Sequence, residues 1–146
     1  MSDSIFSIIG SSLNAQDLRM GAISSNLANA SSVAVPGEQP YRAHELVFQA
    51  QPVVEGEYDG GSGGSGNGAL GVQVVANVQS NAPPTMKYDP GNPYADASGY
   101  VTSSNVSPVE EMVNMIDSSH SYSASVAMLQ QASRIDQQMI SSFQVA

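Results

Sequence analysis

A helix start is encoded in SPVEEMVNMI, residues 107–116. Ser107 is a favourable N-cap, Pro108 suits the first helical position, and Glu110 three residues after the cap completes a capping box. An apolar stripe then continues to Phe143 at a mean step close to the 3.5-residue repeat of helices that pack along a seam. We therefore expect a long helix over residues 107–146. Its seam includes Tyr122, Val126, Leu129 and Ile135.

A second long helix is predicted near the other end of the chain, over residues 3–30. Its apolar positions recur at alternating steps of three and four residues, which again matches a packing seam. At 1.5 Å per residue this helix is roughly 40 Å long, more a rod than the helix of a compact domain. The seam consists of Phe6, Ile9, Leu13, Gln16, Met20, Ile23, Leu27 and Ala30, of which only Gln16 is polar.

The segment between the helices has the pattern of short strands and turns. Residues 43–50 and 72–78 alternate in polarity as strands do, and residues 100–102 form a third short patch. A glycine-rich loop, residues 56–71, separates the first two strands, so we expect a hairpin with a long connection. The expected fold is α+β, with long N- and C-terminal helices packing as a coiled-coil-like pair. The expected division is a helix at 1–32, a β-rich insert at 33–106 and a helix at 107–146.

Composition excludes several classes of protein. Four Lys and Arg residues against 13 Asp and Glu give a net charge of −9, whereas binding to nucleic acid requires clustered bases. Docking on anionic lipid is disfavoured for the same reason, and no apolar run is long enough to insert into a membrane. Cysteine is absent, which excludes disulfides and thiolate metal sites. The N-terminal residues lack the pattern of a cleaved signal peptide.

Motifs that would indicate an enzyme or a cofactor site are weak. The GxGxxG string at residues 66–71 and the GxSxG string at 60–64 arise from glycine density, because no strand leads into either of them. His44 and His120 are too few and too far apart in sequence to suggest a metal site. The oxygens of Asp89, Asn92 and Asp96 lack the spacing of a calcium loop and are better explained by a turn. We expect no catalytic residues, no metal and no cofactor.

The architecture favours a protein that assembles. Both helices combine an apolar seam with Ser, Gln and Asn elsewhere and few charges, so their seams require burial. Neighbouring copies or other subunits would provide it in a polymer. A single chain could instead bury the two seams against each other as an antiparallel pair in a soluble monomer. The pattern alone leaves both arrangements open.

A resemblance to a known family extends over most of the chain. The string SNLANA at residues 25–30 resembles the signature of bacterial flagellar rod and hook proteins. PYRA at 40–43, YDPGNP at 88–93, Asn105-Val106 and EMVNMI at 111–116 are similar to the short members that form the proximal rod. The segment 56–71 is longer than is usual in that family and would be a surface insertion.

The resemblance implies a structural role and no enzymatic activity. It implies a subunit of the flagellar proximal rod, part of the drive shaft and export channel that transmits torque to the distal rod and hook. The protein would leave the cell through the flagellar type III export apparatus without a cleaved signal peptide and reside in the periplasmic rod of the basal body. Its partners would be other rod subunits, the junction protein between rod and MS ring, and copies of itself.

Specific residues follow from the resemblance and the seams together. Asn26 and Asn29 of the family motif Ser25, Asn26, Leu27, Ala28, Asn29 and Ala30 would either hydrogen-bond across to another segment or cap the helix. A secreted or surface ligand-binding module with a helical stalk is the alternative function. Intersubunit packing is predicted for Ile9, Leu13, Met20, Ile23, Leu27, Tyr122, Val126, Leu129 and Ile135.

Overall fold

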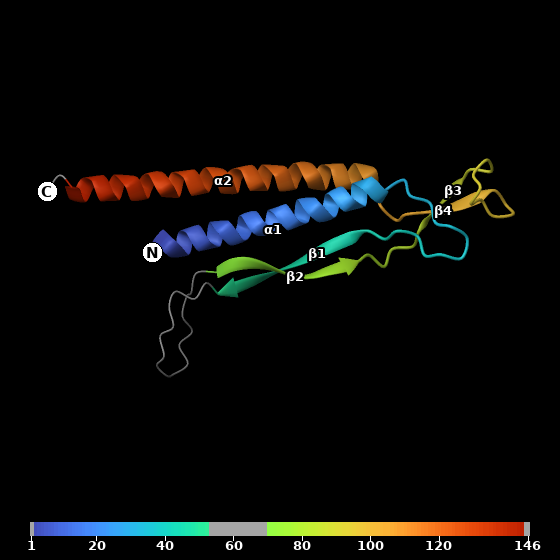
Figure 1. The fold of residues 1–146 in the computed structure, drawn as a ribbon, viewed down its shortest axis with the longest axis horizontal. Helices are drawn as coiled ribbons and strands as arrows, with labels where there is room; N and C mark the ends of the chain where they lie inside the picture. The colour runs from blue at the N-terminus through green and yellow to red at the C-terminus, as the bar shows by residue number, and fades with distance from the viewer. Residues whose placement is uncertain (1, 53–69, 145–146) are drawn as a thin grey trace, which may run out of the picture.

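Two long antiparallel helices form the body of the molecule. The computed structural model describes residues 2–52 and 70–144. Helix α1 spans Ser2–Asn29 and helix α2 spans Pro108–Gln144, and they lie side by side along most of α1 (Figure 1). The α+β fold predicted from the sequence is confirmed, with strands between the helices. The three-part division at residues 32 and 106 stays a prediction.

The start of α2 agrees with its predicted cap. The Glu110 amide donates to the Ser107 hydroxyl at 3.5 Å, and the Glu111 amide donates to the Ser107 carbonyl at 3.0 Å. With 37 residues against 28, α2 is the longer helix, by about 14 Å at 1.5 Å per residue. Its C-terminal end therefore extends past the N-terminus of α1 (Figure 1).

A β-hairpin runs along the side of α1 that faces away from α2. Strand β1 (His44–Pro52) pairs antiparallel with β2 (Leu70–Gln79), as predicted for these two patches. The register shifts by one residue between Val47 and Phe48, because β2 contains an extra residue there. His44 and Leu46 lie half-buried toward α1, but beyond the bulge Phe48 and Ala50 are exposed. Most of the glycine-rich segment 56–71 lies outside the described residues.

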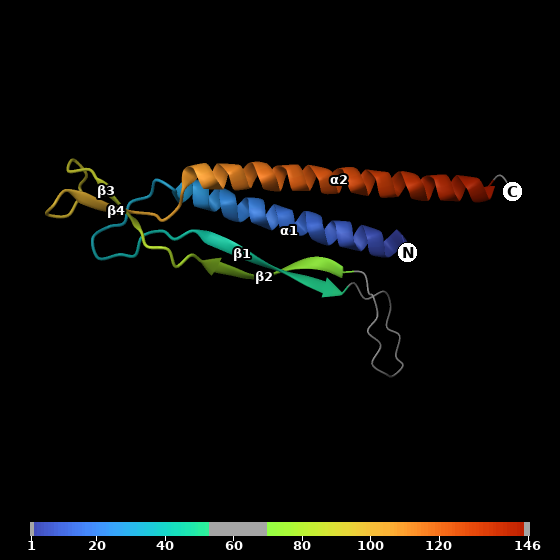
Figure 2. The same cartoon turned by 180° about the vertical axis from the view of Figure 1, so that it is seen from behind.

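A second, smaller strand pair lies beyond the end where α1 finishes (Figure 2). Strand β3 (Thr85–Tyr88) pairs antiparallel with β4 (Tyr100–Ser103), and a single bridge joins Val33 to Ser103. The sequence analysis predicted β4 and missed β3. The turn that joins them needs Gly99, whose φ is +80°.

The apolar core is thin and centres on α1. Among the described residues, α1 contacts α2, β1 and β2, whereas α2 contacts neither strand pair. Helix α1 therefore lies between α2 and the β1–β2 hairpin and contacts both of them. The buried apolar side chains are Ile9, Ala15, Ile23, Ala43, Val101 and Val106.

Candidate functional site

The motif at residues 25–30 ends α1 and fastens the hairpin to it. Asn26 is only 2% exposed. Its Oδ1 accepts the backbone N–H of His44 at 2.8 Å and the Tyr41 hydroxyl at 3.1 Å. Its Nδ2 donates to the His44 carbonyl at 3.0 Å. The amide thus satisfies both backbone groups of His44, as a neighbouring strand would, and fixes the point where β1 leaves the helix.

Asn29 has a different role in the same motif. Its Nδ2 donates to the Ser25 carbonyl at 2.8 Å, within the last turn of α1. The sequence left open whether these two asparagines bond across to another segment or stay within the helix. Asn26 bonds across, and Asn29 bonds within the helix.

Further polar contacts join the segment before α2 to the end of α1. The Ser104 hydroxyl donates to the Ala30 carbonyl at 2.7 Å, and Ser104 itself is 2% exposed. Asn105 Oδ1 accepts the Ala43 amide at 2.7 Å, and its Nδ2 donates to the Ala82 carbonyl at 3.0 Å. Three side chains from two distant parts of the chain therefore hold one end of the molecule together. We call them the polar clasp: Asn26, Ser104 and Asn105.

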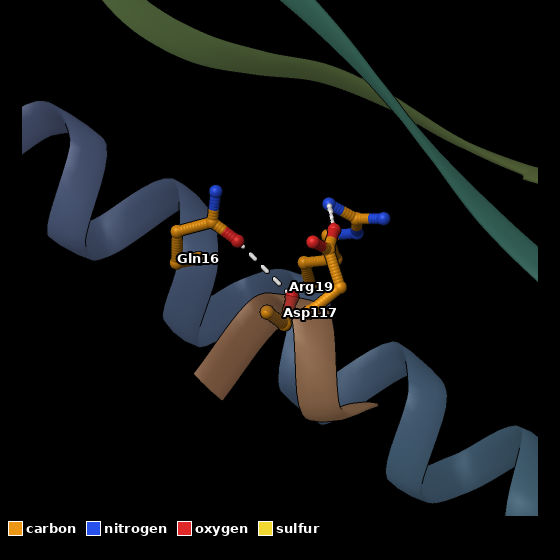
Figure 3. A network of polar contacts seen from close by, with 4 residues as sticks. Gln16, Arg19 and Asp117 are labelled. Atoms are coloured by element: carbon orange, nitrogen blue, oxygen red, sulfur yellow. Dashed lines mark hydrogen bonds and ion pairs between the residues drawn. The ribbon is translucent and has the colours of Figure 1, made fainter. Parts of the chain in front are cut away.

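The interface between the helices is lined by serine. Ser118 has no exposed surface, and its hydroxyl donates to Gln16 Oε1 at 3.0 Å, while the ion pair from Arg19 to Asp117 spans 3.6 Å (Figure 3). About two turns further along α2, Ser125 is 4% exposed. Side chains this small let two helices approach closely, but they bury little apolar area. Around Ser118 and Ser125 the inner face of α2 therefore adds little hydrophobic stabilisation.

The predicted seam residues divide between the inside and the outside of the chain. Ile9 and Ile23 are buried within it, whereas Tyr122 and Ile135 are exposed. The other predicted seam residues are half-buried, and they are Leu13, Met20, Leu27, Val126 and Leu129. Whether these residues make contacts between subunits stays a prediction.

Exposed apolar side chains occur along the whole length of α2, and those of its first turns lie on the face away from α1. Near the start of the helix four large apolar residues project away from α1, and more follow toward the C-terminal end. Met112 and Ile116 belong to the apolar stripe that follows the predicted cap, but in the single chain they are exposed. The exposed set is Val109, Met112, Val113, Ile116, Tyr122, Met128, Ile135, Met139 and Ile140.

The polar residues considered for metal or catalysis are engaged in local structure. Asp96 Oδ1 accepts the amides of Ser98 and Tyr100 at 2.8 and 2.9 Å, and Asn92 Oδ1 accepts the Tyr94 amide at 3.1 Å. These are the bonds of a turn, as expected. Within residues 2–52 and 70–144, no three His, Asp or Glu side chains gather closely enough to hold a metal ion.

The glycine-rich strings and His44 were the other candidates for a catalytic or binding site. The GxSxG string lies entirely outside it, and so do the first four residues of the GxGxxG string. His44 Nδ1 lies 3.0 Å from Asn77 Oδ1 across the hairpin. Neither described helix has the length and hydropathy needed to cross a membrane.

Comparisons with known proteins agree on one family. Residues 97–142 match the family model described as "Flagellar basal body rod FlgEFG protein C-terminal". The flagellar basal-body rod protein FlgC of Salmonella typhimurium is 45% identical over 86% of this chain and 85% of its own. FlgC of Escherichia coli O157:H7 is 46% identical over the same shares of both chains. FlgC of Bacillus subtilis is 36% identical over 84% of this chain and 85% of its own.

Proposed function

This chain belongs to the FlgC family of flagellar basal-body rod proteins, and we propose that it assembles into the rod through the outward face of α2. As a member of that family it is a structural subunit of the flagellar proximal rod and not an enzyme. Nothing in the comparisons supports the alternative of a ligand-binding module.

The observation that carries this proposal is the unequal burial of the two faces of α2. Its inner face presents Ser118 and Ser125 to α1, while Val113 and Ile116 on the outer face are 60% and 57% exposed. An ordinary monomeric helix has the reverse distribution, with its apolar stripe toward the core. Burial of apolar surface contributes about 25 cal/mol per Å², so covering this face with a neighbouring subunit would stabilise an assembly.

The proposed intersubunit contacts use the seam residues that a neighbour can reach. Tyr122 and Ile135 are exposed, and the half-buried side chains of both helices retain accessible surface. Ile9 and Ile23 would support the contact from within the chain, because they pack beneath it. The accessible part of the seam is Leu13, Met20, Leu27, Tyr122, Val126, Leu129 and Ile135.

The proposed partners are other rod subunits, the junction protein between rod and MS ring, and copies of the chain. Its proposed route to the periplasmic rod is the flagellar type III export apparatus. Three features support this route: a thin core, a serine-lined helix interface and the absence of cysteine. A chain of this kind has a small free energy of unfolding, so it can be unfolded for passage through a narrow channel. In the assembled rod, the polar clasp would keep the hairpin and the helices in fixed orientation while torque passes through the subunit.

The test replaces the FlgC protein of a flagellated host by this chain and analyses purified basal bodies by mass spectrometry. We expect the chain in basal bodies, in fixed ratio to the other rod proteins, and swimming cells. Val113→Asp should fold, because its side chain is exposed, but should fail to form rods. The matched control is Val75→Asp, an exposed valine on the hairpin, which should assemble. Absence of the wild-type chain from basal bodies would contradict the proposed role.

A further inference from the structure

The first turns of α2 carry a compact apolar patch with no cover in the chain. We define the α2 patch as Val109, Met112, Val113 and Ile116, which are 71%, 52%, 60% and 57% exposed. Their spacing of three, four and seven residues places them on one stripe of the helix, opposite the serines that face α1. Contiguous exposed apolar surface of this kind marks a binding site for another macromolecule.

Acidic side chains accompany the α2 patch along one flank. Glu110 and Asp117 are both exposed and lie seven residues apart, so they occupy the same side of the stripe two turns from each other. Asp117 meets Arg19 of its own chain at 3.6 Å, but its side chain is 66% exposed, and such a surface pair is weak. Charges beside an apolar seam select which helix can pack on it, because the partner's flanking residues lie directly opposite.

A second copy of this chain has few basic side chains that could pair with Glu110 and Asp117. The whole chain has only four Lys and Arg residues, of which α1 contains Arg19 and α2 contains Arg134. Arg19 already contacts Asp117 of its own chain. Arg134 lies 18 residues beyond Ile116, roughly 27 Å along the helix. Two copies that joined their patches antiparallel would bring the acidic flanks together, and two copies joined in parallel would place each acidic flank opposite a flank without Lys or Arg.

From this charge pattern we infer that the α2 patch binds an amphipathic helix of a different rod protein, one with Lys or Arg beside its apolar seam. The inference rests on the proposed function, since it names the kind of partner that this subunit takes in the rod. Copies of the chain would then meet through other surfaces. The partner's bases would lie opposite Glu110 and Asp117, and its seam would cover Val113 and Ile116.

A binding measurement with the full chain tests the charge preference. The probes are two synthetic helical peptides with the same apolar seam, one flanked by Lys and the other by Glu, followed by fluorescence anisotropy. We expect the Lys-flanked peptide to bind at least tenfold more tightly at low salt, with a smaller difference at high salt. Val113→Ser with Ile116→Ser should weaken its binding at least tenfold.

Matched charge variants separate a local effect from the overall negative charge of the chain. Glu110→Gln with Asp117→Asn should abolish the preference for the Lys-flanked peptide. Glu38→Gln with Glu45→Gln removes the same charge from exposed positions away from the patch and should preserve it. Equal binding of the two peptides to the wild-type chain, or equal loss in both double variants, would overturn the inference.

A photo-crosslinking residue at position 113 identifies the neighbour in assembled basal bodies. A product that joins the chain to a base-flanked helix of another rod protein supports the inference. A product that joins two copies, or an incorporated chain with no product, contradicts it. Failure of the chain to enter basal bodies would instead contradict the proposed function, and the peptide measurement would still decide the charge preference.

Discussion

Replacing Asn26 by alanine should loosen the hairpin from α1. The substitution removes three hydrogen bonds, two with the backbone of His44 and one with the Tyr41 hydroxyl. Each is worth about 0.5–1.5 kcal/mol net, and a buried backbone group without a partner costs more than the mean. We therefore expect Asn26→Ala to lower the free energy of unfolding by about 3 kcal/mol.

Urea unfolding of the purified chain, followed by circular dichroism and tyrosine fluorescence, measures this loss. Amide hydrogen exchange at His44 should also become faster in the variant. Asn26→Asp keeps the size of the side chain, but it places an oxygen opposite the His44 carbonyl and a charge in a buried site, so it should destabilise the chain as well. Asn29→Ala is the control, because it removes one exposed hydrogen bond and should cost less than about 1 kcal/mol. Equal losses in Asn26→Ala and Asn29→Ala would refute the role assigned to the clasp.

Three further substitutions test other parts of the structure, each by urea unfolding. Gly99→Ala should destabilise the chain by about 1–2 kcal/mol, because φ is +80° and the new Cβ would lie 2.9 Å from a ring carbon of Tyr88. Gly37→Ala is the control and should cost less, because its φ is +93° but no atom lies within 4 Å of the new Cβ. A larger loss in Gly37→Ala than in Gly99→Ala would contradict the steric argument. Ser118→Leu should cost about 1–3 kcal/mol by forcing the helices apart and displacing Gln16, and an unchanged stability would show that the interface is not closely packed. Asp117→Asn removes an exposed ion pair and should change stability by less than about 1 kcal/mol; a larger loss would mean that this pair holds the helices together.

The helices were predictable because their signals are local. Ser107, Pro108 and Glu110 lie within four residues of one another, and helix capping depends only on such near neighbours. The apolar seam of α1 likewise indicated which residues would be buried, since Ile9 and Ile23 are. The hairpin could also be anticipated, because strand alternation on both sides of a glycine-rich connection is visible in the sequence.

The inner face of α2 could not be recognised from the sequence. Ser118 and Ser125 have the residue type of a solvated face, and only the close approach of α1 buries them. Ser125 Oγ donates to the Ser121 carbonyl at 3.0 Å and lies 3.4 Å from Ser12 Oγ of α1, so the buried hydroxyl has partners both in its own helix and across the interface. A rule that places apolar residues inside therefore assigns the wrong face to the core at the start of α2.

The contacts of the polar clasp depend on tertiary structure in the same way. The resemblance identified Asn26 as part of a motif, but not His44 as its partner 18 residues away. Asn105 reaches the Ala43 amide across 62 residues. Strand β3 was missed because Met86 and Lys87 at its centre lack the β-branched character of Val101 and Thr102 in β4, and because two prolines precede it.

Methionine oxidation footprinting tests most directly whether the outward face of α2 becomes buried in the rod. Met112, Met128 and Met139 are all exposed on α2 in the single chain, so a brief oxidant pulse should convert each to its sulfoxide in the purified protein. In intact basal bodies that contain this chain, we predict oxidation of Met112 at least tenfold slower than in the free chain. Oxidation of Met112 at the same rate in basal bodies and in the free chain would contradict the account.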